Sequence, residues 1–178
     1  MKKNIFFISI VLIIFILFFK SYFKNNNMKP EDFINTKPII KIENYFEGEV
    51  QAWGLLQDRK GKVTRQFKAD MFGKFENNIL TLEENFFWTD GENQKRVWSI
   101  EKVDEHNYIG TAADVVGKAK GFSYGSAFKF EYDLMIPFKG KNIKISFDDW
   151  IFKQDEDVAI NRATLTKFGF KVGELTVF

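Results

Sequence analysis

The stretch FKFEYDLMI, residues 128–136, alternates apolar and polar side chains. Apolar residues fill every other position and mostly charged residues stand between them: Phe128, Phe130, Tyr132, Leu134 and Ile136 against Lys129, Glu131, Asp133 and Met135. Successive side chains of a β-strand point to opposite faces of its sheet. The stretch therefore predicts a strand with one face in a core and the other mostly in water.

The same alternation recurs on both sides of this strand, from Tyr45 onward, between short turns spaced roughly every ten residues. The turns are rich in Asp, Asn, Gly and Lys, and the Asp90-Gly91 pair is typical of a tight hairpin. About ten strands are expected, at residues 49–57, 62–75, 79–88, 94–101, 108–113, 116–126, 128–136, 142–152, 158–167 and 171–178.

No segment of this region carries the period of an amphipathic helix, so helical crossovers between strands are not expected. Consecutive strands joined by short turns form an up-and-down sheet, and closing that sheet removes its two unpaired edges. We therefore expect an all-β fold, a single antiparallel up-and-down β-barrel of about eight to ten strands over residues 43–178.

The N-terminus has the pattern of an export signal, with Lys2 and Lys3 followed by an apolar run over residues 5–19. The chain has no Cys, so it can neither be lipidated at a lipobox nor form a disulfide. A helix over residues 4–23 would rise about 30 Å, enough to cross a bilayer. We expect residues 1–23 to be an uncleaved signal-anchor and transmembrane helix; the alternative is a cleaved signal peptide.

Two signals bear on orientation, and they disagree. Lysines after the apolar run outnumber those before it, which points the body into the cytoplasm, whereas the position of the run resembles a secretion signal. We favour a single-pass protein of the inner membrane with its body in the periplasm. Residues 24–42, which are polar and interrupted by Pro30 and Pro38, are interpreted as a tether with one helical turn at 31–35.

Phenylalanine is unusually abundant, with 22 Phe in 178 residues. These rings can fill the core or line a pocket. One predicted strand favours a pocket, because one of its faces carries mostly small residues: Val115, Gly117, Ala119, Gly121, Ser123 and Gly125. A neighbouring side chain, a sharply coiled strand or a ligand could occupy the space beside that face.

Two polar clusters interrupt the apolar pattern. Arg96 shares a strand face with Trp98, and Arg162 follows the segment Phe147-Asp148-Asp149-Trp150 and an acidic turn at 154–157. An arginine on an apolar face must be paired, because a lone buried charge is very costly. The pairs either close one end of the barrel or leave an arginine to bind an anionic head group.

Other chemistries have little support in the sequence. His106 is the only histidine and lies in a turn, so a metal site or a catalytic triad is not expected, and no nucleotide-binding glycine motif is present. The net charge of +2 is too small and too evenly spread for nucleic acid. General acid–base catalysis by Asp148 or Asp149 is an open alternative, but we expect a protein that is not an enzyme and that needs no cofactor.

Six segments together resemble the bacterial family called domain of unknown function 3833. They are 45–54, 57–63, 90–98, 110–117, 147–150 and 161–169. The resemblance implies a protein of the Gram-negative envelope, usually a lipoprotein, with a lipocalin-like or calycin-like barrel, and it brings no known activity or catalytic residues. This chain lacks the lipobox Cys of that pattern, which favours retention in the inner membrane.

The sequence thus predicts a membrane-anchored barrel that binds a hydrophobic or amphipathic molecule, such as a lipid. The alternative is an interaction or scaffold module in envelope lipid handling, whose protein partner the sequence does not identify. Apart from the ligand and the membrane, no partner is predicted. The candidate ligand-binding residues are Trp53, Arg96, Trp98, Gly117, Gly121, Asp149, Trp150 and Arg162.

Overall fold

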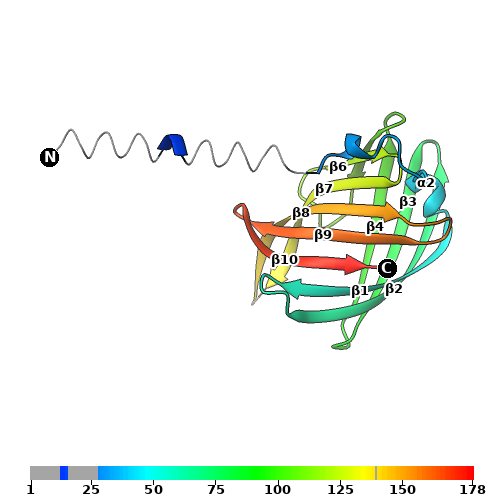
Figure 1. Cartoon of the computed structure of the whole chain (residues 1–178). Coiled ribbons are helices and arrows are strands. Elements are labelled where there is room, and N and C mark those ends of the chain that lie inside the picture. Colours follow the sequence, from blue (N-terminus) through cyan, green and yellow to red (C-terminus); the bar gives the residue numbers. More distant parts are fainter. Residues whose placement is uncertain (1–12, 16–27, 139) are drawn as a thin grey trace.

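A computed structural model describes residues 13–15, 28–138 and 140–178 (Figure 1). Ten antiparallel strands follow one another around a closed barrel, each paired with its neighbours in the sequence. This confirms the predicted all-β, up-and-down barrel. The strands are β1 (Gly48–Asp58), β2 (Val63–Glu76), β3 (Ile79–Trp88), β4 (Asn93–Lys102), β5 (Asn107–Thr111), β6 (Ala119–Tyr124), β7 (Ala127–Phe138), β8 (Lys141–Lys153), β9 (Ala159–Lys167) and β10 (Phe170–Val177).

Pairing between β1 and β10 closes the barrel. The register runs from Gly54 opposite Val177 to Asp58 opposite Gly173. Trp53 and Phe178 extend the ladder, because the amide N–H of each donates to the carbonyl oxygen of the other, at 2.8 and 2.9 Å. The sheet has no unpaired edge at this seam, as the closure argument predicted.

The strand that decides the fold, β7, has the predicted orientation. Phe128, Phe130 and Leu134 are buried in the barrel, and Tyr132 and Ile136 line its interior. Lys129, Glu131 and Asp133, on the other face, form ion pairs on the outside. Burial of each large apolar side chain stabilises the fold by about 1.5–3 kcal/mol.

Aromatic rings occupy the part of the barrel beside β5 and β6. A Cβ atom on Gly121 would lie 2.8 Å from Cζ of Phe128, so the ring of Phe128 takes the space that a side chain would need. Phe130 packs in the same way on Gly110 of β5. The sequence left three explanations for the space beside this small-residue face: a neighbouring side chain, a sharply coiled strand or a ligand. The structure shows that a neighbouring side chain fills it.

The small-residue strand itself is shorter than predicted. Strand β6 covers residues 119–124, and Gly117 and Gly125 lie in the turns before and after it, with φ of +75° and +49°. The predicted face therefore runs out of the strand at both ends. A strand pattern made of glycines cannot mark its own boundaries, because glycine adopts turn conformations as readily as extended ones.

The segment before the barrel covers one end of it. A helical turn, α2 (Ile42–Tyr45), crosses that end, where Ile40 and Ile42 are each 1% exposed, and a 3₁₀ turn, η1 (Pro30–Phe33), packs beside it with Phe33 against the outward rings of Trp150 and Phe152. The Ile40 amide donates to the Gly125 carbonyl at 2.8 Å. The expected helical turn is present, but the tether interpretation of 24–42 did not anticipate this packing.

A buried carboxylate fixes α2 to the barrel. Glu43 is 4% exposed, and it accepts hydrogen bonds from the Tyr108 hydroxyl at 2.8 Å and from the Lys102 ammonium. Burial favours the neutral acid, but the hydrogen bonds outweigh burial and leave the pKa of Glu43 below its ordinary value. Glu43 is therefore held ionised between two donors, and α2 cannot detach from the barrel without breaking both hydrogen bonds.

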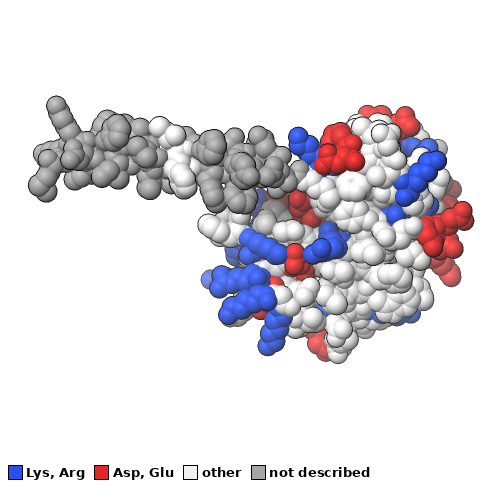
Figure 2. Space-filling view, viewed as in Figure 1, with Lys and Arg blue, Asp and Glu red and all other residues white. Residues whose placement is uncertain are grey.

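The two ends of the barrel differ in cover and in charge. We call the end under α2 the closed end; the open end carries the β1–β2, β3–β4, β7–β8 and β9–β10 hairpins and the β5–β6 loop. Figure 2 shows Lys and Arg gathered where Figure 1 places the β9–β10 hairpin, and acidic residues toward the opposite side. The turns of the open end hold Arg59, Lys60, Lys62, Lys118, Lys141, Lys167 and Lys171, and those of the closed end hold Glu76, Asp104, Glu105, Asp155, Glu156 and Asp157.

The predicted membrane helix over residues 1–23 lies almost wholly outside the described residues. Of that segment the structure describes Ile13 to Phe15, which are helical and exposed. Among the described residues, none of the helices has the length and apolar character needed to cross a bilayer. The anchor stays a prediction from the sequence.

Candidate functional site

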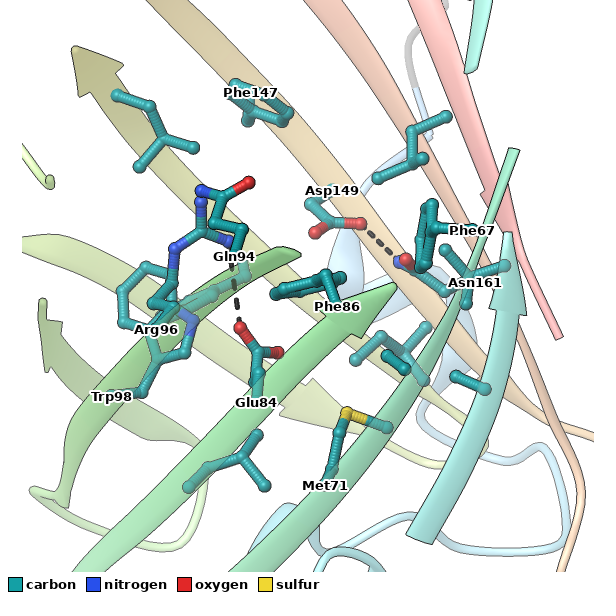
Figure 3. A pocket seen from close by; sticks show the side chains of 18 of the residues that line it. Phe67, Met71, Glu84, Phe86, Gln94, Arg96, Trp98, Phe147, Asp149 and Asn161 are labelled. Atoms are coloured by element: carbon teal, nitrogen blue, oxygen red, sulfur yellow. Dashed lines mark hydrogen bonds and ion pairs between the residues drawn. The ribbon is translucent and has the colours of Figure 1, made fainter. Parts of the chain in front are cut away.

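A cavity of about 560 Å³ lies inside the barrel, on the side away from β5 and β6 (Figure 3). Most of its wall is aliphatic or aromatic. Phe67 and Met71 of β2, Phe86 of β3 and Phe147 of β8 are representative, and Ile42, Tyr45 and Phe46 cover the cavity at the closed end. The alternation of each strand builds this wall, because every second residue points inward.

Arg96 is the central charge of the cavity wall. Its Nη2 atom lies 2.7 Å from Oδ2 of Asp114 and its Nε atom 3.1 Å from Oδ1, so the guanidinium holds both carboxylate oxygens. Its Nη1 atom lies 3.6 Å from Oε2 of Glu84, and Phe86 and Trp98 flank it with ring centroids at 5.7 and 5.9 Å. With a side chain 15% exposed, Arg96 is already committed to two carboxylates.

Glu84 has an unpaired oxygen in the cavity wall. Its Oε2 atom is buried and has no hydrogen-bond partner among the described residues, since 3.6 Å to Arg96 is an ion-pair distance but not a hydrogen bond. Burial raises the pKa of Glu84 to about 7, although the Arg96 charge and the Trp98 indole oppose that rise. Near neutral pH this carboxyl group can therefore be either an acceptor or a donor.

Asp149 is the second carboxyl group of the cavity, and it is 8% exposed. The Tyr132 hydroxyl donates to Oδ2 at 3.0 Å, and the Asn161 amide donates to Oδ1 (Figure 3). Burial raises the pKa of Asp149 to about 6, although both hydrogen bonds favour the ionised form. Its charge also raises the pKa of Glu84, so the two groups are electrostatically linked.

The cavity is acidic when its side chains are ionised. Arg96 supplies one positive charge against Glu84, Asp114 and Asp149. Near the open end, Arg65 lies 2.7 Å from Asp90 and 2.8 Å from Glu92, so that arginine is paired as well. Among the described residues, no three His, Cys, Asp or Glu side chains are grouped as a metal site would require. In the part of the chain that the structure describes, the unpaired polar atoms of the cavity wall are thus Oε2 of Glu84 and the indole N–H of Trp88.

A family model described as protein of unknown function DUF3833 matches residues 20–178. The chain belongs to the DUF3833 family. The family resemblance seen in the six sequence segments is thereby confirmed, and the matched region includes the whole barrel and the segment that covers its closed end. No curated protein matches the chain.

Three of the eight candidate residues line the cavity of this DUF3833 protein. They are Arg96, Trp98 and Asp149. Gly121 points into the barrel but lies beneath the ring of Phe128, and Gly117 lies in the β5–β6 loop. The sequence correctly placed Arg96 and Trp98 on the same face of one strand, and that face points into the barrel.

The other three candidates lie outside the cavity. Trp53 is 51% exposed on the outer face of β1. Arg162 is also on the outer face, with a side chain 60% exposed and its Nη2 atom 3.5 Å from Oε1 of Glu174. Trp150 is opposite Arg162 in the register, and its buried ring packs outside the barrel against Phe33, with centroids 5.9 Å apart. The segment 147–150 has two acids in a row, so its pattern does not say which one faces inward.

Sequence reasoning missed Glu84 and Asn161 as polar residues of the interior; it placed Tyr132 on the buried face but did not anticipate its hydrogen bond to Asp149. The signal for Glu84 was present, because it stands at an inward position between Leu82 and Phe86 of β3. A carboxylate within an apolar alternation is as informative as an arginine there. Asn161 carried a weaker signal, since it becomes significant only when its contact with Asp149 is known.

Proposed function

We propose that this DUF3833 protein is a membrane-anchored, lipocalin-like barrel of the cell envelope that binds a hydrophobic or amphipathic small molecule, such as a lipid, in its interior. The cavity is the observation that carries this proposal. Its volume of about 560 Å³ falls within the range of about 300 to 1,000 Å³ that is usual for ligand pockets. Its wall is mainly apolar with a few converging polar groups, which is also usual for such sites.

The polar groups favour a particular kind of ligand. Arg96 is held by Asp114 and Glu84, so an anionic head group would have to displace carboxylates that are already bound. Glu84 and Asp149 instead present acceptor oxygens to the cavity. This arrangement favours a ligand whose polar end donates hydrogen bonds, an amine or a hydroxyl, over the anionic head group that the sequence suggested.

The anchor and the compartment rest on the sequence. The apolar run at 5–19, preceded by Lys2 and Lys3, supports attachment to a membrane, and the similarity of the N-terminus to a secretion signal supports the periplasm. A barrel so attached would hold its ligand close to the bilayer from which a lipid could come.

Filling the cavity should abolish binding. Met71 points into it, so Met71→Trp adds a ring to the space that a ligand needs. We expect the affinity for aminoanthracene, a neutral aromatic amine, to fall at least about tenfold, or about 1.4 kcal/mol. The measurement is dye fluorescence on titration, with the protein's thermal unfolding as the check on folding.

Phe72→Trp is the matched control, because Phe72 is the next residue on the same strand and is 50% exposed on the outer face. It should bind the dye as the original chain does. Equal binding by both variants would contradict the internal site. The anionic dye anilinonaphthalene sulfonate should bind more weakly than aminoanthracene, because the cavity has an excess of carboxyl groups.

The natural ligand can be sought by native mass spectrometry of the purified chain, followed by organic extraction. We expect an apolar molecule with an amine or hydroxyl group, present in the original chain and in Phe72→Trp and absent from Met71→Trp. A folded protein that carries no extractable molecule and binds neither dye would favour the scaffold alternative.

Acid–base catalysis is the second candidate function. Two carboxyl groups with pKa values raised to about 7 and about 6 line one cavity, and paired groups of this kind are frequent in active sites. The extracted ligand separates the two functions. If it is recovered unchanged after incubation with fresh protein, the barrel is a binder; if a product forms and is lost in Asp149→Asn, the barrel is an enzyme.

A further inference from the structure

The β9–β10 hairpin exposes two aromatic rings at the open end. Phe168 is 89% exposed and Phe170 is 77% exposed, which are the highest values among the large apolar side chains of the described residues. Phe138 of the β7–β8 hairpin is 53% exposed at the same end. Side chains of this size gain by burial, so their exposure at one place suggests contact with an apolar phase.

The turn that holds Phe168 is an unfavourable place for it. Phe168 has a φ of +52° and Gly169 a φ of +80°, a left-handed pair that hairpins usually fill with Asn-Gly. The β2–β3 turn of the closed end has the same kind of backbone, and it uses Asn77 and Asn78 at φ of +52° and +63°. A bulky side chain at positive φ costs stability. This cost suggests that the Phe168 ring serves a contact outside its own turn.

Basic residues surround these rings. Lys167 lies with its Nζ atom 5.5 Å from the Phe168 ring centroid, and Lys171 follows on β10. At the same end are Arg59, Lys60 and Lys62 of the β1–β2 turn and Lys141 of β8, all exposed. Aromatic rings flanked by lysines suit the interface of a membrane, where the rings enter the head-group region and the ammonium groups remain among the phosphates.

The acidic groups of the open end offset this charge only in part. Asp90 and Glu92 are paired with Arg65 and Glu174 with Lys171, and Asp58 is the one acid of its turn beside Arg59, Lys60 and Lys62. The opposite end has acidic turns and is covered by α2. The molecule is therefore polarised along the barrel axis, and one orientation is favoured at an anionic surface.

We propose that the open end docks on the surface of an anionic lipid bilayer, with Phe168 and Phe170 inserted among the head groups. Docking of this kind points the open end of the barrel toward the lipid. Residues near that end, among them Arg65, Glu92 and Pro137, also line the cavity. The basic residues of these turns favour anionic lipid as the binding partner of the open end. The proposal does not depend on which molecule fills the cavity.

The full chain can test this because it has no native Cys. Phe170→Cys and Asn78→Cys place a single thiol at the open and closed ends, and each is labelled with the dye NBD. After reconstitution into vesicles of phosphatidylcholine with phosphatidylglycerol, we expect NBD at position 170 to shift its emission to the blue and to be quenched by brominated lipid. At position 78 it should behave as in water.

A charge reversal at the hairpin gives the second arm. Lys167→Glu with Lys171→Glu, in the Phe170→Cys chain, should return the NBD emission to that of the water-exposed label and weaken quenching roughly tenfold. Lys153→Glu, at the closed end, should leave it unchanged. In vesicles of phosphatidylcholine alone, or at high salt, the signal at position 170 should fall because the attraction is electrostatic.

Two results would overturn docking: the same water-like emission at positions 170 and 78, or quenching that survives the double reversal in full. Aminoanthracene binding by the same variants reports the cavity separately. In the Phe170→Cys chain without the charge reversal, absence of dye binding together with strong quenching would therefore count against the proposed ligand site alone, and absence of quenching together with normal dye binding would count against docking alone.

Discussion

Replacing Arg96 by Met is expected to lower the free energy of unfolding by about 3–5 kcal/mol. The guanidinium binds both oxygens of Asp114 and lies 3.6 Å from Glu84, inside a mainly apolar cavity. Met keeps much of the side-chain volume but leaves these carboxylates without their cation, and an unpaired buried charge is far costlier than the pair was beneficial. Urea denaturation at neutral pH measures the loss.

Arg162→Met is the matched control for Arg96→Met. Arg162 is the exposed arginine of β9, with only a 3.5 Å contact to Glu174, so its loss should cost less than about 1 kcal/mol. Adding Asp114→Asn and Glu84→Gln to Arg96→Met should recover part of the stability, because it removes the stranded charges. Similar losses for Arg96→Met and Arg162→Met would show that the internal pair does not support the barrel.

Glu84→Gln is expected to stabilise the barrel above neutral pH, by up to about 3 kcal/mol. The pKa of Glu84 is about 7 in the folded protein against an ordinary value of 4.5. Glu84 therefore ionises more readily in the unfolded chain than in the folded protein. The resulting loss of stability develops as the pH rises from 4.5 to about 7. Below that window both states are protonated and the loss is absent.

The test of Glu84→Gln is its pH dependence. Unfolding in urea should show the full gain at about pH 8 and little difference at about pH 4. Glu83→Gln is the control, because Glu83 is the neighbouring outward residue, paired with Lys95 at 2.7 Å, and its replacement should change stability by less than about 1 kcal/mol at either pH. If Glu84→Gln raised the free energy of unfolding equally at both pH values, the raised pKa of Glu84 would be refuted.

The strands could be predicted from sequence because each carries its own evidence. In β7 the alternation of Phe128, Phe130 and Tyr132 with charged residues identifies both the strand and its inner face. Closure followed from a general argument about sheet edges, and the pairing of Gly54 with Val177 confirms it. The strands can be predicted from residues that are close together in the chain, and closure can be predicted from the number of strands.

The candidate site was less predictable because it depends on contacts between distant strands. The face with Gly121 looked vacant, since the alternation shows that Phe128 points inward but not that its ring lies over Gly121 of the neighbouring strand. Asp148 and Asp149 are identical in type, and only the register places Asp149 opposite inward Phe130 and leaves Asp148 outside. Ile40 and Ile42 form too short an apolar group to indicate burial, so the cover of the closed end was missed.

Strand β1 pairs with both β2 and β10. Since β1 is the first barrel strand to be synthesised and β10 is the last, β1 remains without its second partner until synthesis is nearly complete. Contacts so far apart along the chain are slow to form, and until then β1 can pair with a foreign strand. We therefore expect the emerging polypeptide to rely on a holding chaperone until residues 170–177 are available. The finished ring should then unfold slowly, because no terminal strand can peel away without breaking two ladders.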